Sequence, residues 1–274
     1  MDAIVLAGGR FAPTDALHAQ APNGYKCLLE LGGKPMVQWS LDALSDTRDI
    51  DRVIVVGLPV STELRCRHQL TLIEGGSDMI GSIQAAGQYL LREGADAAGH
   101  ALIVSADAPL ISGAMVQWLL ERVAENDDDL SICVVERAVM EARFPESKRT
   151  YVRLRDTDVC GGDVNACRLS VTRRGVAIAE RLARARKSPL RLALIIGLDT
   201  LVQLVLRRLT LAQAMRTISA RLGVSAGAIV CPYAEVGMDV DKPSQLAIAR
   251  AILKARGDAE PGRDANPGRD ADPG

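Results

Sequence analysis

The first half of the chain alternates short runs of β-branched residues with segments of helical periodicity, and this alternation limits the fold more than any other feature. Such a repeat is typical of a parallel sheet covered by helices. Strands are expected at 3–6, 52–56, 101–105 and 130–135. Helices are expected between them, with apolar residues at three- and four-residue spacing, at 36–44, 80–91 and 113–125. The pattern predicts an α/β fold with a doubly wound, mostly parallel sheet.

The second half interrupts this alternation. Strands are expected at 151–155, 166–171, 228–230 and 236–240. A long helical stretch, broken at Pro189 and near Thr210, predicts a helical subdomain inserted at about 173–225. A closing helix is expected from Pro243, because proline suits a first helical turn, to about Arg256.

The last part of the chain has a different composition. Within residues 257–274 the segment 261–266, Pro-Gly-Arg-Asp-Ala-Asn, recurs almost unchanged at 267–272, and this sequence offers little apolar surface to bury. A disordered tail is therefore expected after a single domain over 1–256.

Composition narrows the class of protein. With 48% hydrophobic residues among 274, the chain can build a full core. A net charge of −1 produces no field that would gather nucleic acid or an anionic membrane. Aromatic residues, at 3%, are too few for the stacking surfaces of single-strand binders. Nucleic acid is therefore excluded as a partner.

Cysteines and apolar stretches bear on the compartment. The six cysteines include no C-x-x-C pair, and the first residues lack a basic segment, which predicts a reduced, cytoplasmic protein with buried thiols. The most apolar stretch, 190–206, contains Arg191 and Asp199 and is shorter than the roughly 20 residues that a bilayer requires. A core helix is expected there rather than a membrane span. The oligomeric state stays open.

A glycine turn, Leu6-Ala7-Gly8-Gly9-Arg10, directly follows the first expected strand. Adjacent glycines let backbone N–H groups approach an anion, and open α/β sheets bind ligands at the loops after their strands. A tight turn without a ligand explains the glycines equally well. Lys26, after a polar loop at 22–25, could neutralise the oxygens of a triphosphate, and it favours the binding site.

With Lys26 and the following segment 27–36, the sequence resembles the nucleotidyltransferase superfamily of the GT-A type fold. It is most similar to the branch of molybdenum cofactor guanylyltransferases and sugar-phosphate nucleotidyltransferases. In that family a Leu-Ala-Gly-Gly turn and such a lysine hold the triphosphate, which here implies Leu6 to Arg10 and Lys26. The family's third glycine and later arginine are absent from the loop. Arg10 and Arg48 could replace the arginine, although Arg48 is better explained as a solvated charge at a helix end.

Asp107 follows another expected strand, in Val104-Ser105-Ala106-Asp107-Ala108-Pro109. A carboxylate in a dry site is costly to keep charged without a cation, and Mg²⁺ prefers one or two carboxylates combined with phosphate oxygens. A helix N-cap or turn acid before Pro109 is the alternative. Together with the resemblance, the position favours Asp107 as a metal ligand.

A third segment, 235–243, carries two further acids. If it forms a strand, its period of two places Asp239 and Asp241 on one face. A similar segment of the family ends in Asp-Thr-Pro or Asn-Thr-Pro and completes the metal site. The resemblance implies Mg²⁺ as the cofactor, Asp241 as a ligand and Asp239 in support. Lys242 stands in place of the capping threonine, which weakens the helix cap.

Two glycine-containing segments are further candidates. In the family, the segment corresponding to 74–83 faces the nucleotide base, which implies Gly76 and Ser82; capping of the helix by Ser77 and Asp78 is the equally good alternative.

The segment 159–166 stands where relatives hold the acceptor, which implies Gly162 and Asn165, an amide able to donate to and accept from hydroxyls. A plain β-turn explains these residues nearly as well.

Two remaining groups carry less information. Basic residues crowd the stretch from Arg173 to Arg191, which is best explained as a solvated helix face, although Arg186 and Lys187 could hold an acceptor phosphate. The histidines at 18, 68 and 100 are too scattered to suggest a metal cluster.

The sequence thus predicts a magnesium-dependent nucleotidyltransferase with Lys26, Asp107 and Asp241 as catalytic residues. An acceptor phosphate oxygen is expected to attack the α-phosphorus of a nucleoside triphosphate, releasing pyrophosphate. The acceptor is expected to be a phosphorylated small molecule such as a sugar phosphate. The alternatives are the pterin phosphate of a molybdenum cofactor guanylyl- or cytidylyltransferase and, in another class, a nucleotide-binding module without turnover.

Overall fold

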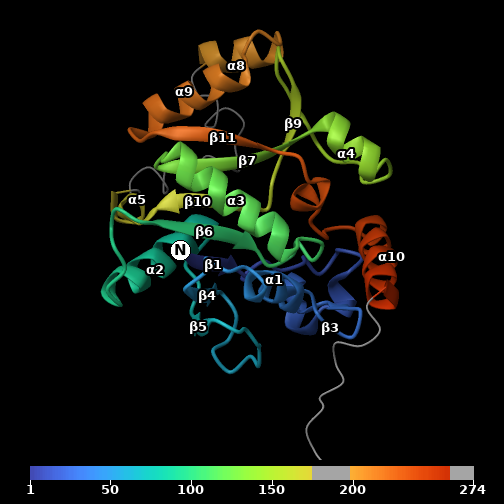
Figure 1. Ribbon diagram of the computed structural model, residues 1–274. Helices are drawn as coiled ribbons and strands as arrows, with labels where there is room; N and C mark the ends of the chain where they lie inside the picture. Colours follow the sequence, from blue (N-terminus) through green and yellow to red (C-terminus); the bar gives the residue numbers. More distant parts are fainter. Residues whose placement is uncertain (175–197, 260–274) are drawn as a thin grey trace, which may run out of the picture.

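The computed structural model describes residues 1–174 and 198–259. In these residues a central sheet of nine strands has the order β5-β4-β1-β6-β10-β7-β9-β8, with β11 paired to β7 (Figure 1). The strands are β1 (Asp2–Leu6), β4 (Arg52–Val56), β5 (Gln69–Ile73), β6 (His100–Ser105), β7 (Leu130–Glu136), β8 (Val152–Arg153), β9 (Asp158–Gly161), β10 (Val164–Arg168) and β11 (Ala226–Cys231). Most strands run in one direction, and β9 and β10 run against their neighbours. The predicted α/β class with a mostly parallel sheet is confirmed.

Helices cover both faces of this sheet. They are α1 (Met36–Ser45), α2 (Met79–Arg92), α3 (Gly113–Asn126), α4 (Arg137–Arg143), α5 (Leu169–Arg174), α8 (Leu198–Val205), α9 (Leu211–Leu222) and α10 (Pro243–Ala259). α1 and α3 contact each other and lie in front of the sheet in Figure 1, while α2 packs with α5 and against β1 and β4. A separate small sheet pairs β2 (Glu30–Leu31) with β3 (Lys34–Pro35). Short 3-10 turns are η1 (His18–Gln20), η2 (Pro22–Gly24), η3 (Lys26–Leu28) and η4 (Ala234–Gly237).

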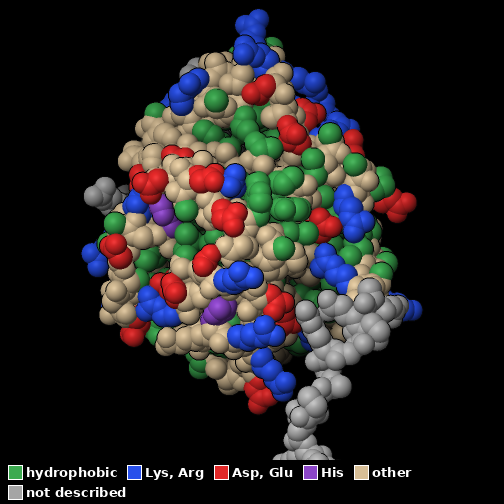
Figure 2. Space-filling model, in the orientation of Figure 1, with side chains coloured by type: hydrophobic (Ala, Val, Ile, Leu, Met, Phe, Trp, Pro, Cys, Tyr) green, Lys and Arg blue, Asp and Glu red, His purple; other side chains and the backbone are tan. Residues whose placement is uncertain are grey.

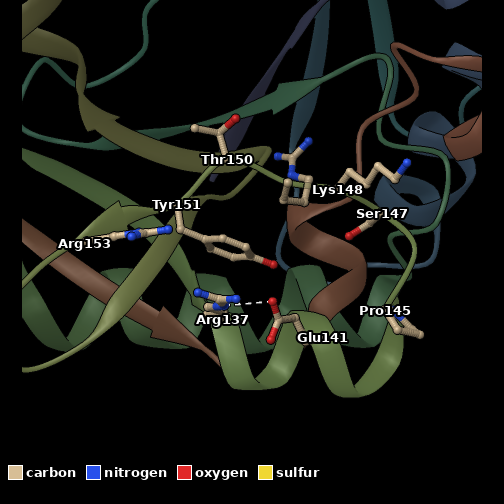
Figure 3. A pocket seen from close by; sticks show the side chains of 9 residues that line it. Arg137, Glu141, Pro145, Ser147, Lys148, Thr150, Tyr151 and Arg153 are labelled. Carbon is tan, nitrogen blue, oxygen red and sulfur yellow. Dashed lines mark hydrogen bonds and ion pairs between the residues drawn. The ribbon is translucent and has the colours of Figure 1, made fainter.

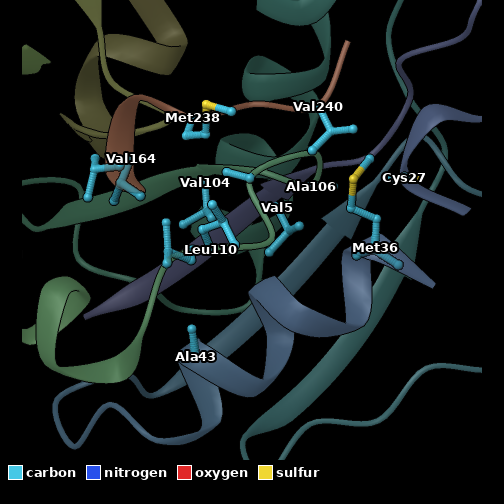
Figure 4. Packing of buried hydrophobic residues seen from close by; sticks show 14 of the residues in the cluster. Val5, Cys27, Met36, Ala43, Val104, Ala106, Leu110, Val164, Met238 and Val240 are labelled. Atoms are coloured by element: carbon cyan, nitrogen blue, oxygen red, sulfur yellow. The ribbon is translucent and has the colours of Figure 1, made fainter. Parts of the chain in front are cut away.

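Alternate strand residues point to opposite faces of the sheet, which produces separate cores. In β1, Ala3 and Val5 belong to the large core, whereas Ile4 belongs to the core against α2. Figure 4 shows Val5 of β1 and Val104 of β6 packed with residues from α1 and from the segment before α10. The strands therefore gain burial on both faces, as their continuous apolar runs require.

Two expected strands are corrected by the structure. The segment 236–240 forms η4 and an irregular stretch, and strand β10 ends at Arg168 where 166–171 was expected to be extended. In the first case every second residue, Val236, Met238 and Val240, is fully buried, which is the burial pattern typical of a strand. Their backbone groups nevertheless bond singly to separate partners instead of forming a ladder.

In the second case, the N–H groups that follow β10 bond to the turn before β6. Leu169 donates to Gly99 O at 2.9 Å and Ser170 to Ala97 O at 2.9 Å. The Leu169 side chain joins the core beneath α2, so the chain continues as α5 rather than as strand.

The domain organisation stays a prediction. Residues 175–197 and 260–274, which include Arg186, Lys187, Pro189 and most of the expected tail, lie outside the described residues. On either side of that gap the backbone is helical in α5, α8 and α9, and Thr210 caps α9 with a capping box. α10 begins at Pro243 as expected and extends to Ala259, past the expected end at Arg256.

All six cysteines are free, and each of them is buried except Cys66, which is half-buried. Among the helices of the described ranges, none combines the length and the apolar character needed to cross a bilayer.

Candidate active site

Glycines pack the loops after β1, β4 and β5 against each other, backbone on backbone. Gly57 has a φ of +104°, and a Cβ there would lie 2.6 Å from both N and Cα of Gly8. A Cβ at Gly75 would lie 3.0 Å from Gly57 Cα. Because side chains would separate these loops, glycine is required where they meet. The loops form one surface at the carboxyl ends of the strands, where open α/β sheets bind ligands.

The glycine turn opens from this surface toward solvent. Ala7 is buried and its N–H donates to Val56 O, whereas Gly8, Gly9 and Arg10 are exposed. Arg10 forms an isolated bridge with Tyr25, and its guanidinium carbon lies 3.9 Å from the centre of the Tyr25 ring. The turn thus presents exposed backbone beside a positive charge.

Lys26 lies directly against this turn. Its N–H donates to Gly9 O at 3.0 Å, and its Nζ reaches Asp241 Oδ1 at 2.5 Å. Burial alone would lower the pKa of Lys26, but the hydrogen bond to Asp241 and the charges of Asp241 and Asp107 outweigh it, so the pKa lies above its ordinary value. The ammonium is therefore held charged between the glycine turn and the acidic segment.

Backbone hydrogen bonds assemble the acidic side of the site. Val240 N donates to Asp107 O at 3.0 Å, and Ser105 N donates to Asp163 O at 2.8 Å. Asp163 N in turn donates to Val236 O at 2.7 Å. These bonds join the end of β6 and the residues that follow it, the turn between β9 and β10, and η4 with the segment after it. Acids that are distant in sequence are brought together in this way.

Asp107 emerges from β6 into this junction. Burial raises its pKa; the hydrogen bond from Ser105 Oγ lowers it, and the nearby charge of Asp241 raises it again. The net pKa lies above the usual value for an aspartate. The hydrogen bond from Ser105 and the charge of Lys26 therefore do not offset the burial of the Asp107 carboxylate.

Asp239 faces a different cation. Its Oδ1 accepts from Arg149 Nη1, and the side chains of Arg149 and Asp239 are 15% and 20% exposed. Burial raises the pKa of Asp239, which Arg149 opposes, and the charges of Asp241 and Asp107 raise it further. Asp239 and Asp241 therefore do not share a strand face as expected, and each has its own cationic partner.

Gln245 holds the acidic segment at the start of α10. Its Oε1 accepts from the N–H groups of Asp241 and Lys242, both at 2.9 Å, and the side chain is buried. The cap that Lys242 cannot provide is thus supplied from inside the helix, in the manner of a capping-box partner.

Asp163 is a site residue that the sequence analysis did not single out. Its Oδ2 is buried and has no hydrogen-bond partner among the described residues. Burial, followed by the charges of Asp107 and Asp239, raises its pKa well above the ordinary value, and Arg149 offsets only part of this. The signal was present, since Asp163 directly follows Gly161-Gly162 beside a buried strand. Arg149 had no comparable signal.

We call these acids the carboxylate cluster; its members are Asp107, Asp163, Asp239 and Asp241. Within the described chain, four carboxylates opposed by Lys26 and Arg149 leave two negative charges when fully ionised. No three His, Cys, Asp or Glu side chains of that part of the chain converge closely enough to hold a metal ion on their own. A cation here would therefore need further oxygens from water or from a ligand.

Gly76 and Ser82 meet at the start of α2. Gly76 N donates to Ser82 Oγ at 3.1 Å, and a Cβ at Gly76 would lie 2.3 Å from the carbonyl carbon of Gly81. Asp78 is the N-cap of α2 and accepts from Gly81 N at 2.8 Å. Helix capping by Asp78 is confirmed. Contact of Gly76 and Ser82 with a base stays a prediction. The two residues lie beside Gly75, at the surface formed by the glycine-packed loops.

Gly162 and Asn165 make contacts within the sheet itself. Asn165 Oδ1 accepts from Cys133 N at 2.9 Å, and its Nδ2 donates to Gly162 O at 3.0 Å. A Cβ at Gly162 would lie 2.8 Å from Cys133 Sγ, so internal packing accounts for this glycine. Their contact with an acceptor stays a prediction without further geometric support.

Arg48 does not replace the missing loop arginine. It is exposed in the turn before β4, and Asp51 N of the same turn bonds to Met1 O at the start of β1. The amino ends of parallel strands lie at the opposite edge of the sheet from the loops after them. Arg10 is the arginine that the structure places at the glycine turn.

Comparisons with known proteins show the class and the family of the chain. By class, the chain is a nucleotidyltransferase. Residues 3–153 match the model of the MobA-like NTP transferase domain, and this chain is a member of that family.

The individual relatives differ in their sequence identity to this chain. A hypothetical transferase from Thermus thermophilus is 33% identical, with 89% of this chain and 98% of that chain covered and a TM-score of 0.78. A 2-C-methyl-D-erythritol 4-phosphate cytidylyltransferase from Lachnospira eligens is 24% identical over 177 residues, which are 59% of this chain and 73% of the relative. A CMP:2-keto-3-deoxy-manno-octonic acid synthetase complexed with CTP shares the fold, at 14% identity, 93% and 99% coverage and a TM-score of 0.56.

Proposed function

We propose that this protein transfers a nucleoside monophosphate from a nucleoside triphosphate to a phosphorylated small molecule, with Mg²⁺ as cofactor and pyrophosphate as the second product. The observation that carries the proposal is the carboxylate cluster, which lies across Lys26 from an exposed glycine turn and, when ionised, carries two more charges than its cations Lys26 and Arg149. A divalent cation would match that charge, and a triphosphate would supply oxygens that the protein does not.

The donor groups suit magnesium. All members of the cluster offer carboxylate oxygens, which hard cations prefer, and the buried Oδ2 of Asp163 lacks any other partner in the described chain. Asp107 and Asp241 would hold the ion, with Asp239 in support. When bound, Mg²⁺ supplies charge neutralisation at the phosphates.

The protein's own groups have distinct parts in the transfer. The exposed N–H groups of the glycine turn would orient the triphosphate, and the Lys26 ammonium would stabilise the charge that develops on departing pyrophosphate. The acceptor phosphate oxygen attacks the α-phosphorus, the bond to the β-phosphate oxygen breaks, and no protein nucleophile is required. Asp163 and Arg149 position the cluster rather than react.

A matrix of substrates tests the proposal. Pyrophosphate release is measured with each nucleoside triphosphate, CTP and GTP included, against sugar phosphates, methylerythritol 4-phosphate and a molybdopterin-type pterin phosphate. Activity that requires Mg²⁺ and one of these acceptors supports the transferase. Release only with the pterin would identify a molybdenum cofactor transferase. Tight nucleotide binding without pyrophosphate release from any pair would indicate a binding module and overturn the proposal.

A further inference from the structure

A basic cavity lies beside the carboxylate cluster. It has a volume of about 450 Å³ and is bounded by α4 and by the segment from 145 to 153. Figure 3 shows Arg137, Arg153 and Tyr151 gathered on one side and Lys148 with Ser147 on the other. Its volume lies within the range of about 300–1,000 Å³ that is usual for small-molecule sites.

The cavity contains more positive than negative charge. Its cations are Arg137, Lys148, Arg149 and Arg153, and its acid is Glu141. Arg137 is already engaged, with Glu141 Oε1 at 2.7 Å and Asp158 Oδ2 at 3.6 Å. In the described part of the chain, Lys148 and Arg153 are exposed and have no ion-pair partner. Two cations are therefore available to an anion.

Arg149 connects the cavity to the proposed reaction site. It lines the cavity, and its Nη1 donates to Asp239 of the carboxylate cluster. A guanidinium has five N–H donors, so one contact with Asp239 leaves others for a second anion. Its pKa is raised, because the charges of Asp239 and Asp163 outweigh the effect of burial, and it stays charged. An anion in the cavity would thus lie next to the carboxylate cluster.

We propose that this cavity binds the acceptor through its phosphate monoester, with Lys148, Arg149 and Arg153 providing the positive charge. The proposal rests on the function proposed above and adds the location of the acceptor. A doubly charged phosphate matches the unpaired cations, and charge-assisted bonds of this kind are among the stronger polar contacts. Thr150 and Tyr151 also line the cavity, and residues with hydroxyl groups suit a polyhydroxy carbon skeleton.

The test measures the affinity of inorganic phosphate by calorimetry. The intact protein is first saturated with Mg²⁺ and a non-hydrolysable nucleoside triphosphate, so that phosphate cannot occupy the triphosphate site. The variant is Lys148→Ala/Arg153→Ala. The matched control is Arg155→Ala/Arg208→Ala, which removes the same charge from exposed arginines that do not line the cavity.

The double variant should weaken phosphate binding about tenfold or more, and the control should change it less than about twofold. Nucleotide affinity should be unchanged in both, which shows that the proteins are folded. Equal phosphate affinity in variant and control, or no phosphate binding by the unaltered protein, would overturn the proposal.

A failure of the proposed function gives a different result. Phosphate binding that depends on Lys148 and Arg153, without pyrophosphate release from any substrate pair, would support the anion site and contradict the proposed transferase activity. Conversely, transfer to a phosphorylated acceptor whose KM the double variant leaves unchanged would place the acceptor elsewhere.

Discussion

The ammonium of Lys26 lies 2.5 Å from the carboxylate of Asp241, although 215 positions separate the two residues in the sequence. One belongs to η3 beside the glycine turn, and the other precedes α10. The pair therefore joins the surface expected to hold a triphosphate to the carboxylate cluster expected to hold Mg²⁺. Acidic and basic side chains are elsewhere interspersed on the face seen in Figure 2, so attraction of a polyanion depends on such local arrangements.

Lys26→Met should lower turnover more than it weakens nucleotide binding, because negative charge builds on pyrophosphate as it leaves. Removing one contact of this kind costs about 2–4 kcal/mol of barrier, or roughly one and a half to three decades in rate. Calorimetry gives the affinity and single-turnover pyrophosphate release gives the rate, with the exposed Lys254→Met as control. If affinity and rate fall in equal proportion, Lys26 is a uniform anchor; if neither falls, the triphosphate is bound elsewhere.

Asp107→Ala and Asp241→Ala should each reduce turnover at least about a hundredfold, because each removes a proposed ligand of Mg²⁺. Asp239→Ala should cost less, since its carboxylate is already paired with Arg149. Turnover is titrated against Mg²⁺, and the melting temperature checks the fold. Full activity of the first two variants at saturating Mg²⁺ would contradict the metal assignment.

Asp163→Asn should stabilise the protein without divalent cations at neutral pH. The pKa of Asp163 is raised in the folded state by burial, by Asp107, Asp239 and Asp241, and despite Arg149. Such a group favours folding below its unfolded pKa of about 4, and that contribution is lost as the pH rises through the folded pKa. The gain in melting temperature should therefore be absent near pH 4 and grow toward neutral pH.

The exposed Glu63→Gln serves as the control for this experiment and should show no such pH dependence. Addition of Mg²⁺ should raise the melting temperature of the unaltered protein more than that of Asp163→Asn. A variant that is less stable than the unaltered protein at neutral pH would show that Asp163 has a buried partner after all.

Gly57→Ala should destabilise the fold and weaken nucleotide binding. Its Cβ would require a φ of +104° and would lie 2.6 Å from the backbone of Gly8, at a cost of about 1–3 kcal/mol from strain and overpacking. Gly94→Ala is the control, since Gly94 also has a positive φ, +85°, but no atom lies within 4 Å of its Cβ. Chemical denaturation and calorimetry measure both effects. Identical behaviour of the two variants would mean that loop packing does not shape the nucleotide site.

The sequence by itself determined the bounds of several strands and helices of the first half and the positions where ligands are expected. β4 has the bounds expected for it, 52–56, and the bounds of α1, α2 and α3 lie within one residue of the expected ones. These elements follow from local periodicity, which a single sequence contains. The same holds for Gly8, Gly9 and Asp107, because a loop after a buried strand can be recognised without knowing its neighbours.

Only the tertiary structure decided how the acids are partnered. The alternating apolar residues of 236–240 predicted a strand, but the chain there bonds singly to Asp107 and Asp163. Periodicity reports which side chains are buried and not where the backbone hydrogen bonds go. Likewise the pKa of Asp163 depends on its burial and on the charges near it, among them Arg149. Electrostatic interactions depend on distance and dielectric rather than on sequence separation, so only the folded structure determines them.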